Sequence, residues 1–135
     1  MRRIETWFLL LAALCLIMGM TLGIVMGVMR DFSLRPVHAH LNLLGWVTLA
    51  LFGLVYRGWP ELARSPLARL HFALSGSGAL LMPAGIWLAI AHGQTTPAFL
   101  GAFASLGGAL VFLVALLRSL TEPAAARPAG YHARR

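Results

Sequence analysis

Residues 7–29 read WFLLLAALCLIMGMTLGIVMGVM, an apolar run without a charged side chain. A helix needs about 20 such residues to cross the roughly 30 Å of hydrocarbon in a bilayer. Three further runs reach that length, at 37–56, 67–91 and 97–117. Only helices and closed barrels satisfy their backbone in lipid, and continuous apolar runs of this length are helical. The sequence therefore predicts an all-α membrane protein, a bundle of four transmembrane helices.

The composition excludes an ordinary water-soluble domain. Of the 135 residues, 59% are hydrophobic and 11% are charged, whereas soluble proteins have about 45–50% apolar residues. The first run is too long for a signal-peptide core and no small-residue cleavage site follows it, so we expect it to remain as a span. Residues 1–120 are expected to form one domain. The tail 121–135, rich in Ala, Pro, Arg and Gly and containing His132, is expected to be disordered.

The arginines predict the orientation, because the chain contains no lysine. Nine arginines lie on one side of the four spans: Arg2, Arg3, Arg57, Arg64, Arg69, Arg118, Arg127, Arg134 and Arg135. Only Arg30 and Arg35 lie on the other side. The positive-inside rule then places both termini in the cytoplasm, for a multi-pass protein of the bacterial inner membrane. The net charge of +7 indicates orientation and contact with lipid headgroups, and no nucleic-acid partner is expected.

The histidines are the candidate functional residues, since an ionisable side chain at membrane depth is functional by default. His38 and His40 open the second span, and neutral imidazole is a metal ligand. The third span runs back across the membrane, so His92 returns to the level of His38. His71 lies about 31 Å from His92 at 1.5 Å per residue. We expect His71 to be an interfacial side chain beside Arg69, outside any site that His38 and His92 share.

Helical phase distinguishes the two histidines of the second span. They lie about 200° apart around the helix and face different ways. His38 shares its face with Asn42 and Gly45, which suits the bundle interior. His40 faces lipid or a partner helix and is the less favoured metal ligand. The alternatives are a capping or water-binding role for His38 and an interfacial role for His92, which adjoins the polar loop 93–96.

Glycines lie below both candidate ligands. Gly45 is seven residues deeper than His38, and Gly85 is seven residues deeper than His92, so each pair lies on one helix face. Such glycines leave space for a flat porphyrin between two histidines, or alternatively for close helix packing. The first span contains a third set, spaced four residues apart, which predicts close approach of a helix or a flat ligand: Gly19, Gly23 and Gly27. The single Cys15 lies inside the same span, so no disulfide forms within the chain and the thiol is expected to pack.

The segment from Arg35 to Asn42 (RPVHAHLN), followed by an apolar helix that ends in Val55-Tyr56-Arg57, resembles a known family. It is similar to the second transmembrane helix of subunit I in the heme–copper oxidase superfamily, nearest to the cbb3-type cytochrome c oxidase and nitric oxide reductase branch. There an Arg-Pro-x-His or Arg-x-x-His start presents an axial ligand to the low-spin b heme. The resemblance implies that His38 ligates heme b. It covers the second span with its flanks and, more loosely, the first and third spans.

The departures from that family limit the function that the resemblance implies. Subunit I has about twelve spans, whereas this chain has room for four. The helices that carry the second low-spin ligand, the copper ligands and the high-spin ligand have no counterpart, so reduction of oxygen or nitric oxide by a binuclear centre is not expected. The second ligand would be His92 or a histidine of a second subunit.

We therefore expect an integral membrane b-type heme protein that transfers electrons in or beside a respiratory chain. Its expected partners are membrane lipids and either a second copy or a respiratory complex. Two alternatives remain open: a heme carrier or assembly factor, and an accessory subunit of a respiratory oxidase that binds no cofactor.

Overall fold

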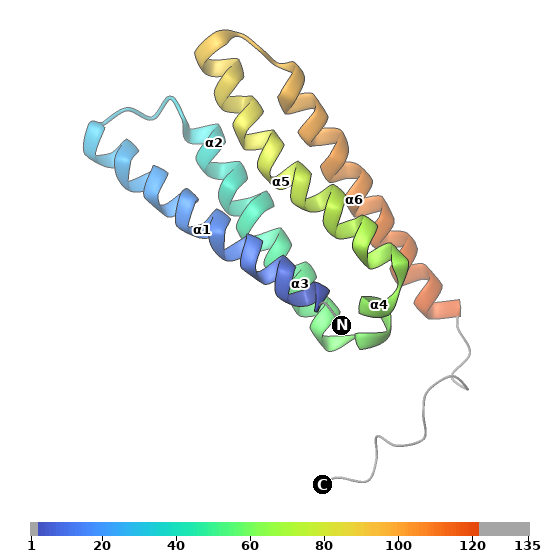
Figure 1. The fold of residues 1–135 in the computed structure, drawn as a ribbon. Helices are drawn as coiled ribbons and strands as arrows, with labels where there is room; N and C mark the ends of the chain where they lie inside the picture. The colour runs from blue at the N-terminus through green and yellow to red at the C-terminus, as the bar shows by residue number, and fades with distance from the viewer. Residues whose placement is uncertain (1–2, 122–135) are drawn as a thin grey trace, which may run out of the picture.

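The computed structural model describes residues 3–121, which fold into helices joined by short turns (Figure 1). The helices are α1 (Ile4–Met29), α2 (Arg35–His40), the π-helix η1 (Leu41–Thr48), α3 (Leu49–Gly58), α4 (Pro60–Arg64), α5 (Pro66–His92) and α6 (Thr96–Thr121). Four stretches are long and apolar enough to span a membrane: Ile4–Met29, Arg35–Gly58, Pro66–His92 and Thr96–Leu120. This confirms the all-helical prediction with four spans. The tail expected to be disordered, with His132, lies outside the described residues.

The helix ends follow from local sequence. Ser65 caps α5, since its hydroxyl oxygen accepts a hydrogen bond from the Leu67 N–H at 3.2 Å, and Pro66 follows at the first helical position. Proline suits this position because its missing N–H would have no helical partner there. At the other end of α5, Gly93 has a φ of 70°, the left-handed conformation that closes many helices. Arg30 adopts the same conformation after α1, with a φ of 53°.

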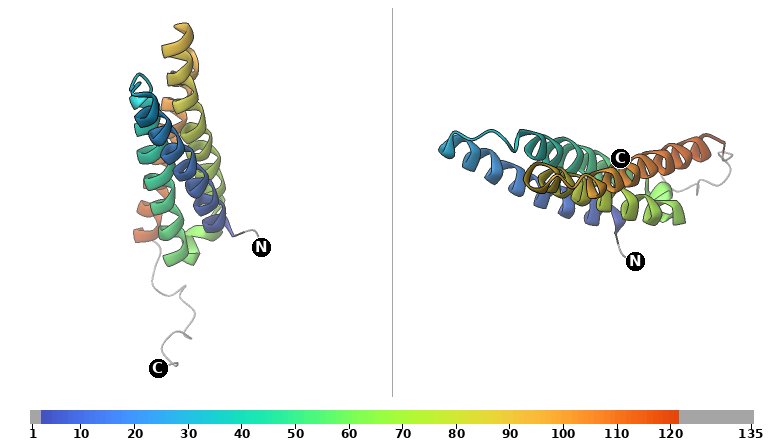
Figure 2. Two further views of the ribbon diagram at one scale, coloured as in Figure 1. Left: turned by 90° about the vertical axis from the view of Figure 1, so that its left-hand side faces the viewer. Right: turned by 90° about the horizontal axis from the view of Figure 1, so that it is seen from above.

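The bundle consists of two helical hairpins side by side (Figures 1 and 2). In the first, α1 packs against the rod formed by α2, η1 and α3; in the second, α5 packs against α6. The core between them is formed by buried side chains from all four spans, among them Phe8, Leu49, Tyr56, Ala79 and Ala115. The start of α1 and the end of α6 lie at the same end of the bundle.

Glycines bring α5 and α6 into backbone contact. A Cβ atom on Gly85 would overlap the backbone of Pro97 and Ala98, and one on Gly101 would lie 2.6 Å from the Met82 Cα. Each of the two helices thus contributes a glycine that faces the backbone of the other helix. Small residues of this kind are the usual means by which membrane helices pack closely.

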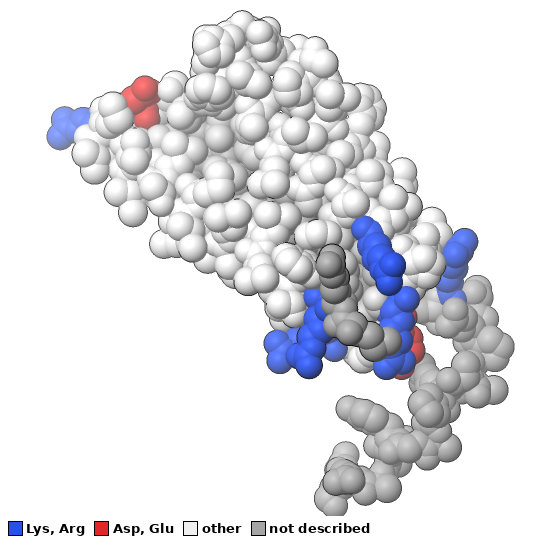
Figure 3. Space-filling view, in the orientation of Figure 1, with Lys and Arg blue, Asp and Glu red and all other residues white. Residues whose placement is uncertain are grey.

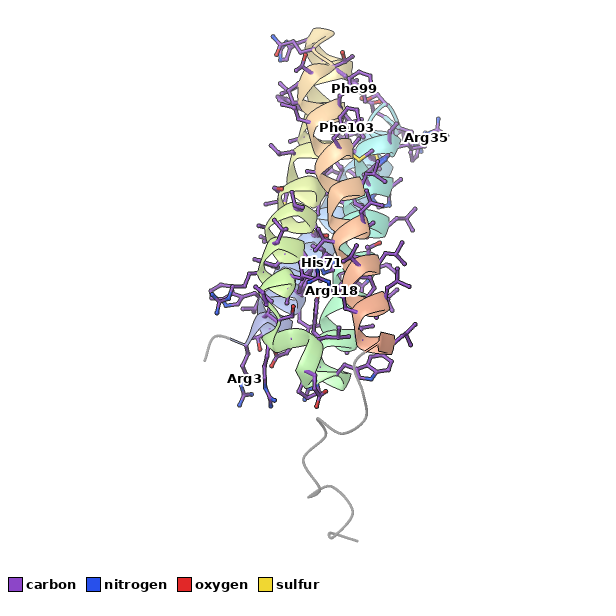
Figure 4. All side chains as sticks on the ribbon, turned by 90° about the vertical axis from the view of Figure 1, so that its right-hand side faces the viewer. Arg3, Arg35, His71, Phe99, Phe103 and Arg118 are labelled. Carbon is purple, nitrogen blue, oxygen red and sulfur yellow. The ribbon has the colours of Figure 1, made fainter. Side chains whose placement is uncertain are left out.

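The outer surface of the bundle is apolar between two polar ends. Large apolar side chains are exposed on the spans, including Ile24, Val28 and Phe103, of which Val28 is 80% exposed. Figure 4 shows Phe99 and Phe103 on α6, and Figure 3 shows that the charged side chains of the described residues on the face it draws gather at the two ends. An exposed apolar belt of this extent indicates a lipid-facing surface. We call the end at which α1 begins the basic end, and the opposite end, where α2 begins and α5 terminates, the histidine end.

Candidate functional site

His38 lies on α2 at the histidine end, where its ring faces α1 and is partly buried. Its Nδ1 lies 2.9 Å from the carbonyl oxygen of Gly19 on α1, so the Nδ1–H tautomer donates a hydrogen bond to this carbonyl. This tautomer leaves a lone pair on Nε2. Among residues 3–121, Nε2 has no hydrogen-bond partner, and it is not one of the fully enclosed polar atoms. The ring therefore has one nitrogen fixed by the backbone and one nitrogen available.

The glycines of α1 create the space that the His38 ring occupies. A Cβ on Gly23 would lie 2.8 Å from the His38 Cε1, and one on Gly19 would lie 2.8 Å from the Asn42 Oδ1. The Asn42 amide in turn donates a hydrogen bond to the His38 carbonyl at 2.8 Å. The predicted close approach is thus confirmed at these two glycines. A Cβ added at Gly27 would have no neighbour within 4 Å beyond its own stretch of helix, so no helix of the described chain approaches there. Close approach of a second copy or of a flat ligand at Gly27 stays a prediction.

The loop before α2 fixes how that helix begins. The Asp31 carboxylate accepts a hydrogen bond from the Ser33 N–H at 2.9 Å, and this bond lowers the pKa of Asp31. Arg35 Nε donates to the Phe32 carbonyl at 3.2 Å, with its guanidinium 5.8 Å from the Phe32 ring centre. These short-range contacts order the turn that sets the position of His38.

A π-helix follows directly after the two histidines. In η1 the backbone takes more residues per turn than in an α-helix, and the Thr48 hydroxyl donates to the Leu43 carbonyl, five residues back, at 2.7 Å. Turns of this kind occur frequently at functional sites. The apolar run 37–56 predicts a regular α-helix, so the π-helical segment was not evident from the sequence.

Gly45 and Gly85 take part in helix packing. A Cβ on Gly45 would lie 2.7 Å from the Cβ of Cys15, which is buried as predicted, and Gly85 faces the α6 backbone. The space that both glycines leave is therefore already filled within the chain. Of the two roles that the sequence left open for these glycines, close helix packing is the one that the contacts describe.

No hydrogen bond or ring contact links His92 or His40 to His38 among the described residues. His92 is exposed at the end of α5, where its ring packs edge-on against Trp87 at 5.8 Å between centres. α2, which carries His38, packs against α5, the helix that ends in His92. The His40 Nδ1 lies 2.7 Å from the Pro36 carbonyl. No group of three or more His, Cys, Asp or Glu side chains that could hold a metal occurs among the described residues.

His71 is a fully enclosed histidine, 0% exposed, inside the bundle toward the basic end (Figure 4). The expectation of an interfacial side chain is wrong, because this face of α5 points into the core. Aromatic rings from the other three spans surround His71, and we call them the aromatic box: Phe8, Phe52, Tyr56 and Phe112, with centres 4.3–5.7 Å away. The Tyr56 hydroxyl lies 2.9 Å from His71 Nδ1.

Two enclosed polar atoms in and near the aromatic box have no hydrogen-bond partner among the described residues. Within residues 3–121, His71 Nε2 and Ser75 Oγ are the enclosed side-chain atoms that lack a hydrogen-bond partner. Ser75 lines a small cavity of about 70 Å³ together with Thr48 and Ser105. A cavity of this size with several hydroxyl groups has room for water. His71 Nε2 is enclosed by aromatic rings. Within the described chain, the imidazole of His71 therefore has one polar contact, between its Nδ1 and the Tyr56 hydroxyl.

A signal for the His71 site was present in the sequence. Tyr56 and His71 are polar groups near the ends of consecutive spans at the basic end, and antiparallel spans bring such positions to one level. The aromatic residues that complete the box are spaced along apolar runs in which most side chains face lipid, so the sequence does not show that these rings point toward His71.

No protein-family model, no curated protein and no solved structure matches this chain.

Proposed function

We propose that this chain is an integral membrane protein that binds heme b through His38 and transfers electrons in or beside a respiratory chain. The observation that carries the proposal is the His38 ring, whose Nδ1 is held by the Gly19 carbonyl while Nε2 has no partner among the described residues. Histidines that ligate metals almost always donate their second N–H to a carbonyl, a carboxylate or water. The resemblance of residues 35–42 to the ligand helix of heme–copper oxidase subunit I supports heme as the metal carrier.

When bound, heme b would supply one-electron redox chemistry, tuned by its axial ligands and its burial. His38 would hold the iron through Nε2. The Gly19 carbonyl would fix the tautomer and the ring orientation, and would raise the basicity of the ligand. Gly45 and Gly85 would contribute through helix packing, which keeps α1 against η1 and α5 against α6.

The second histidine that would hold the heme iron is His92 or a histidine from a second copy of the chain. Within the chain, α2 packs against α5, the helix that ends in His92. A second copy would supply its histidine if the histidine ends of two copies adjoin in a homodimer. Two histidines would saturate the iron, which suits electron transfer rather than gas binding.

The orientation is part of the proposal. Arginines gather at the basic end, and the positive-inside rule supports a cytoplasmic location for that end and for both termini. The histidine end would then lie at the outer side of a bacterial inner membrane. Heme at this level would face electron donors or acceptors on the outer side.

The test is the visible spectrum of the detergent-purified protein, oxidised and then reduced. We expect a low-spin b-type spectrum for the unmodified chain, and loss of heme in His38→Ala, because the axial bond fixes the ring in its site. His38→Gln keeps the side-chain size and should lose heme while remaining folded. His40→Ala is the matched control and should retain heme, since the His40 ring bonds to its own helix.

The outcomes distinguish the alternatives. A colourless unmodified protein would contradict heme binding and favour an accessory subunit without cofactor. Heme that exchanges rapidly to an acceptor protein would favour a carrier or assembly factor. A full low-spin spectrum in His38→Ala would refute the ligand assignment and transfer it to His40. High-spin heme that binds carbon monoxide in His92→Ala would identify His92 as the sixth ligand.

A further inference from the structure

The basic end contains a groove lined by arginines from several helices. It has a volume of about 1280 Å³ and lies between the start of α1, the end of α3, α4 and the start of α5. Arg57, Arg64 and Arg69 line it together with Arg3, which directly precedes α1. Figure 3 shows arginine side chains gathered at this end of the molecule. We call this feature the basic groove.

The guanidinium groups of the basic groove have no protein partners in the described part of the chain. None of the four guanidinium groups forms a hydrogen bond or an ion pair there. The groove contains one acidic side chain, Glu5, so four positive charges face one negative charge and the local net charge is +3. Unpaired guanidinium groups that line one groove favour the binding of an anion there. A planar guanidinium can also donate two parallel hydrogen bonds to the oxygens of one phosphate.

The remaining walls of the groove are apolar and aromatic. Trp7 and Ile4 line it from α1 and Phe72 lines it from α5. Tyr56 also lines the groove. Its hydroxyl is already paired with His71 Nδ1 at 2.9 Å, so its ring is the part that remains for a ligand. The ligand that suits this lining therefore carries its charge at one end and hydrocarbon at the other.

The position of the groove indicates the source of that ligand. The groove lies where the apolar belt of the four spans ends, which is the level at which a bilayer would place its lipid headgroups. Trp7, which is 48% exposed, is the type of residue that settles at this interface. Pockets of about 300–1,000 Å³ hold drug-sized ligands, so this groove has room for a headgroup with the first part of its acyl chains.

We propose that the basic groove is a binding site for one anionic phospholipid, with Arg57, Arg64 and Arg69 contacting the phosphate and Trp7 and Phe72 contacting the upper acyl chain. The excess of positive charge discriminates against zwitterionic lipids, whose ammonium group the arginines repel. Basic pockets between membrane helices bind anionic headgroups in this way. The site lies at the opposite end of the bundle from His38 and does not depend on heme.

Native mass spectrometry of the full chain in non-ionic detergent tests the proposal. Phosphatidylglycerol and phosphatidylcholine with identical acyl chains are titrated separately, and the retained lipid is counted. We expect one phosphatidylglycerol to bind selectively. Arg64→Gln with Arg69→Gln should weaken its binding about 30-fold, roughly fivefold for each arginine. Arg64→Lys with Arg69→Lys, which keeps the charge but loses the fork, should weaken it less.

The matched control for one arginine is Arg30→Gln at the other end, compared with Arg64→Gln alone, and it should leave the lipid affinity unchanged. Equal binding of the two lipids would overturn the proposal. So would an equal loss in the control variant, since that would indicate attraction by net charge alone. Displacement of the lipid by millimolar glycerol phosphate would identify a soluble phosphate compound as the ligand and would likewise refute a lipid site. Displacement by an acidic peptide, with no lipid selectivity, would indicate a protein partner instead.

Discussion

Replacing Tyr56 with phenylalanine tests the pairing of Tyr56 with His71. The change keeps the ring that stacks on Phe8 at 5.5 Å and removes the hydroxyl 2.9 Å from His71 Nδ1. A hydrogen bond between membrane helices is worth about 0.6 kcal/mol on average. Here the loss is larger, because His71 Nε2 already lacks a partner among the described residues and the whole imidazole would become unpaired. An unsatisfied buried group costs about 1–3 kcal/mol, and we expect Tyr56→Phe to destabilise by that amount.

The assay is reversible unfolding in mixed micelles of a non-ionic detergent and dodecyl sulfate, followed by circular dichroism. His71→Leu and the double variant complete a mutant cycle, which isolates the pair because the double variant leaves neither group unpaired. We expect the double variant to cost about 1 kcal/mol less than the sum of the single variants. Ser119→Ala is the control, since this exposed hydroxyl bonds only within its own helix. A cost below about 0.5 kcal/mol for Tyr56→Phe, or strict additivity, would refute the reasoning.

Other predictions concern the glycines and the orientation. Gly101→Ala should destabilise the α5–α6 hairpin by about 2 kcal/mol or more, because the new Cβ would lie 2.6 Å from the Met82 Cα; Gly27→Ala, with open space around it, should be neutral or slightly stabilising in the same assay. Gly23→Leu should displace the His38 ring and disturb the contact between α1 and α2, and unchanged stability and heme content would contradict this. Reporter fusions at Arg118 and Gly93 should give opposite compartment signals, and equal signals would exclude the four-span arrangement.

The number of spans and their helical nature could be predicted from the sequence because lipid imposes one dominant requirement. Every spanning backbone must satisfy its own hydrogen bonds, so an apolar run such as 7–29 admits little besides a helix. Both ends of α5 could also be predicted from the sequence, since Pro66 is typical of the first position of a helix and Gly93 is typical of its end. Each of these features depends on residues near one another in the chain.

The inner contacts were less accessible because they depend on which faces of different helices meet. Phase along the second span correctly directed His38 and Gly45 toward the bundle interior. It could not tell that Cys15 fills the space beside Gly45, or that Gly85 meets the backbone of α6. The burial of His71 shows the same limit, since depth along a helix says nothing of the direction in which a side chain points.

The π-helical segment lets the second span contain one residue more than a regular α-helix without turning its two ends. Hydrogen bonds from residue i to i+5 take up the extra residue, so deleting one residue from Leu41–Thr48 would restore i to i+4 bonds and a regular α-helix. The wider turns and the extra residue offset each other, so His38 would still face α1 and Tyr56 would still lie in the aromatic box. A one-residue deletion elsewhere in the span would instead rotate one half by about 100° relative to the other. The length of this span can therefore change by one residue at Leu41–Thr48 without a change in what its ends contact.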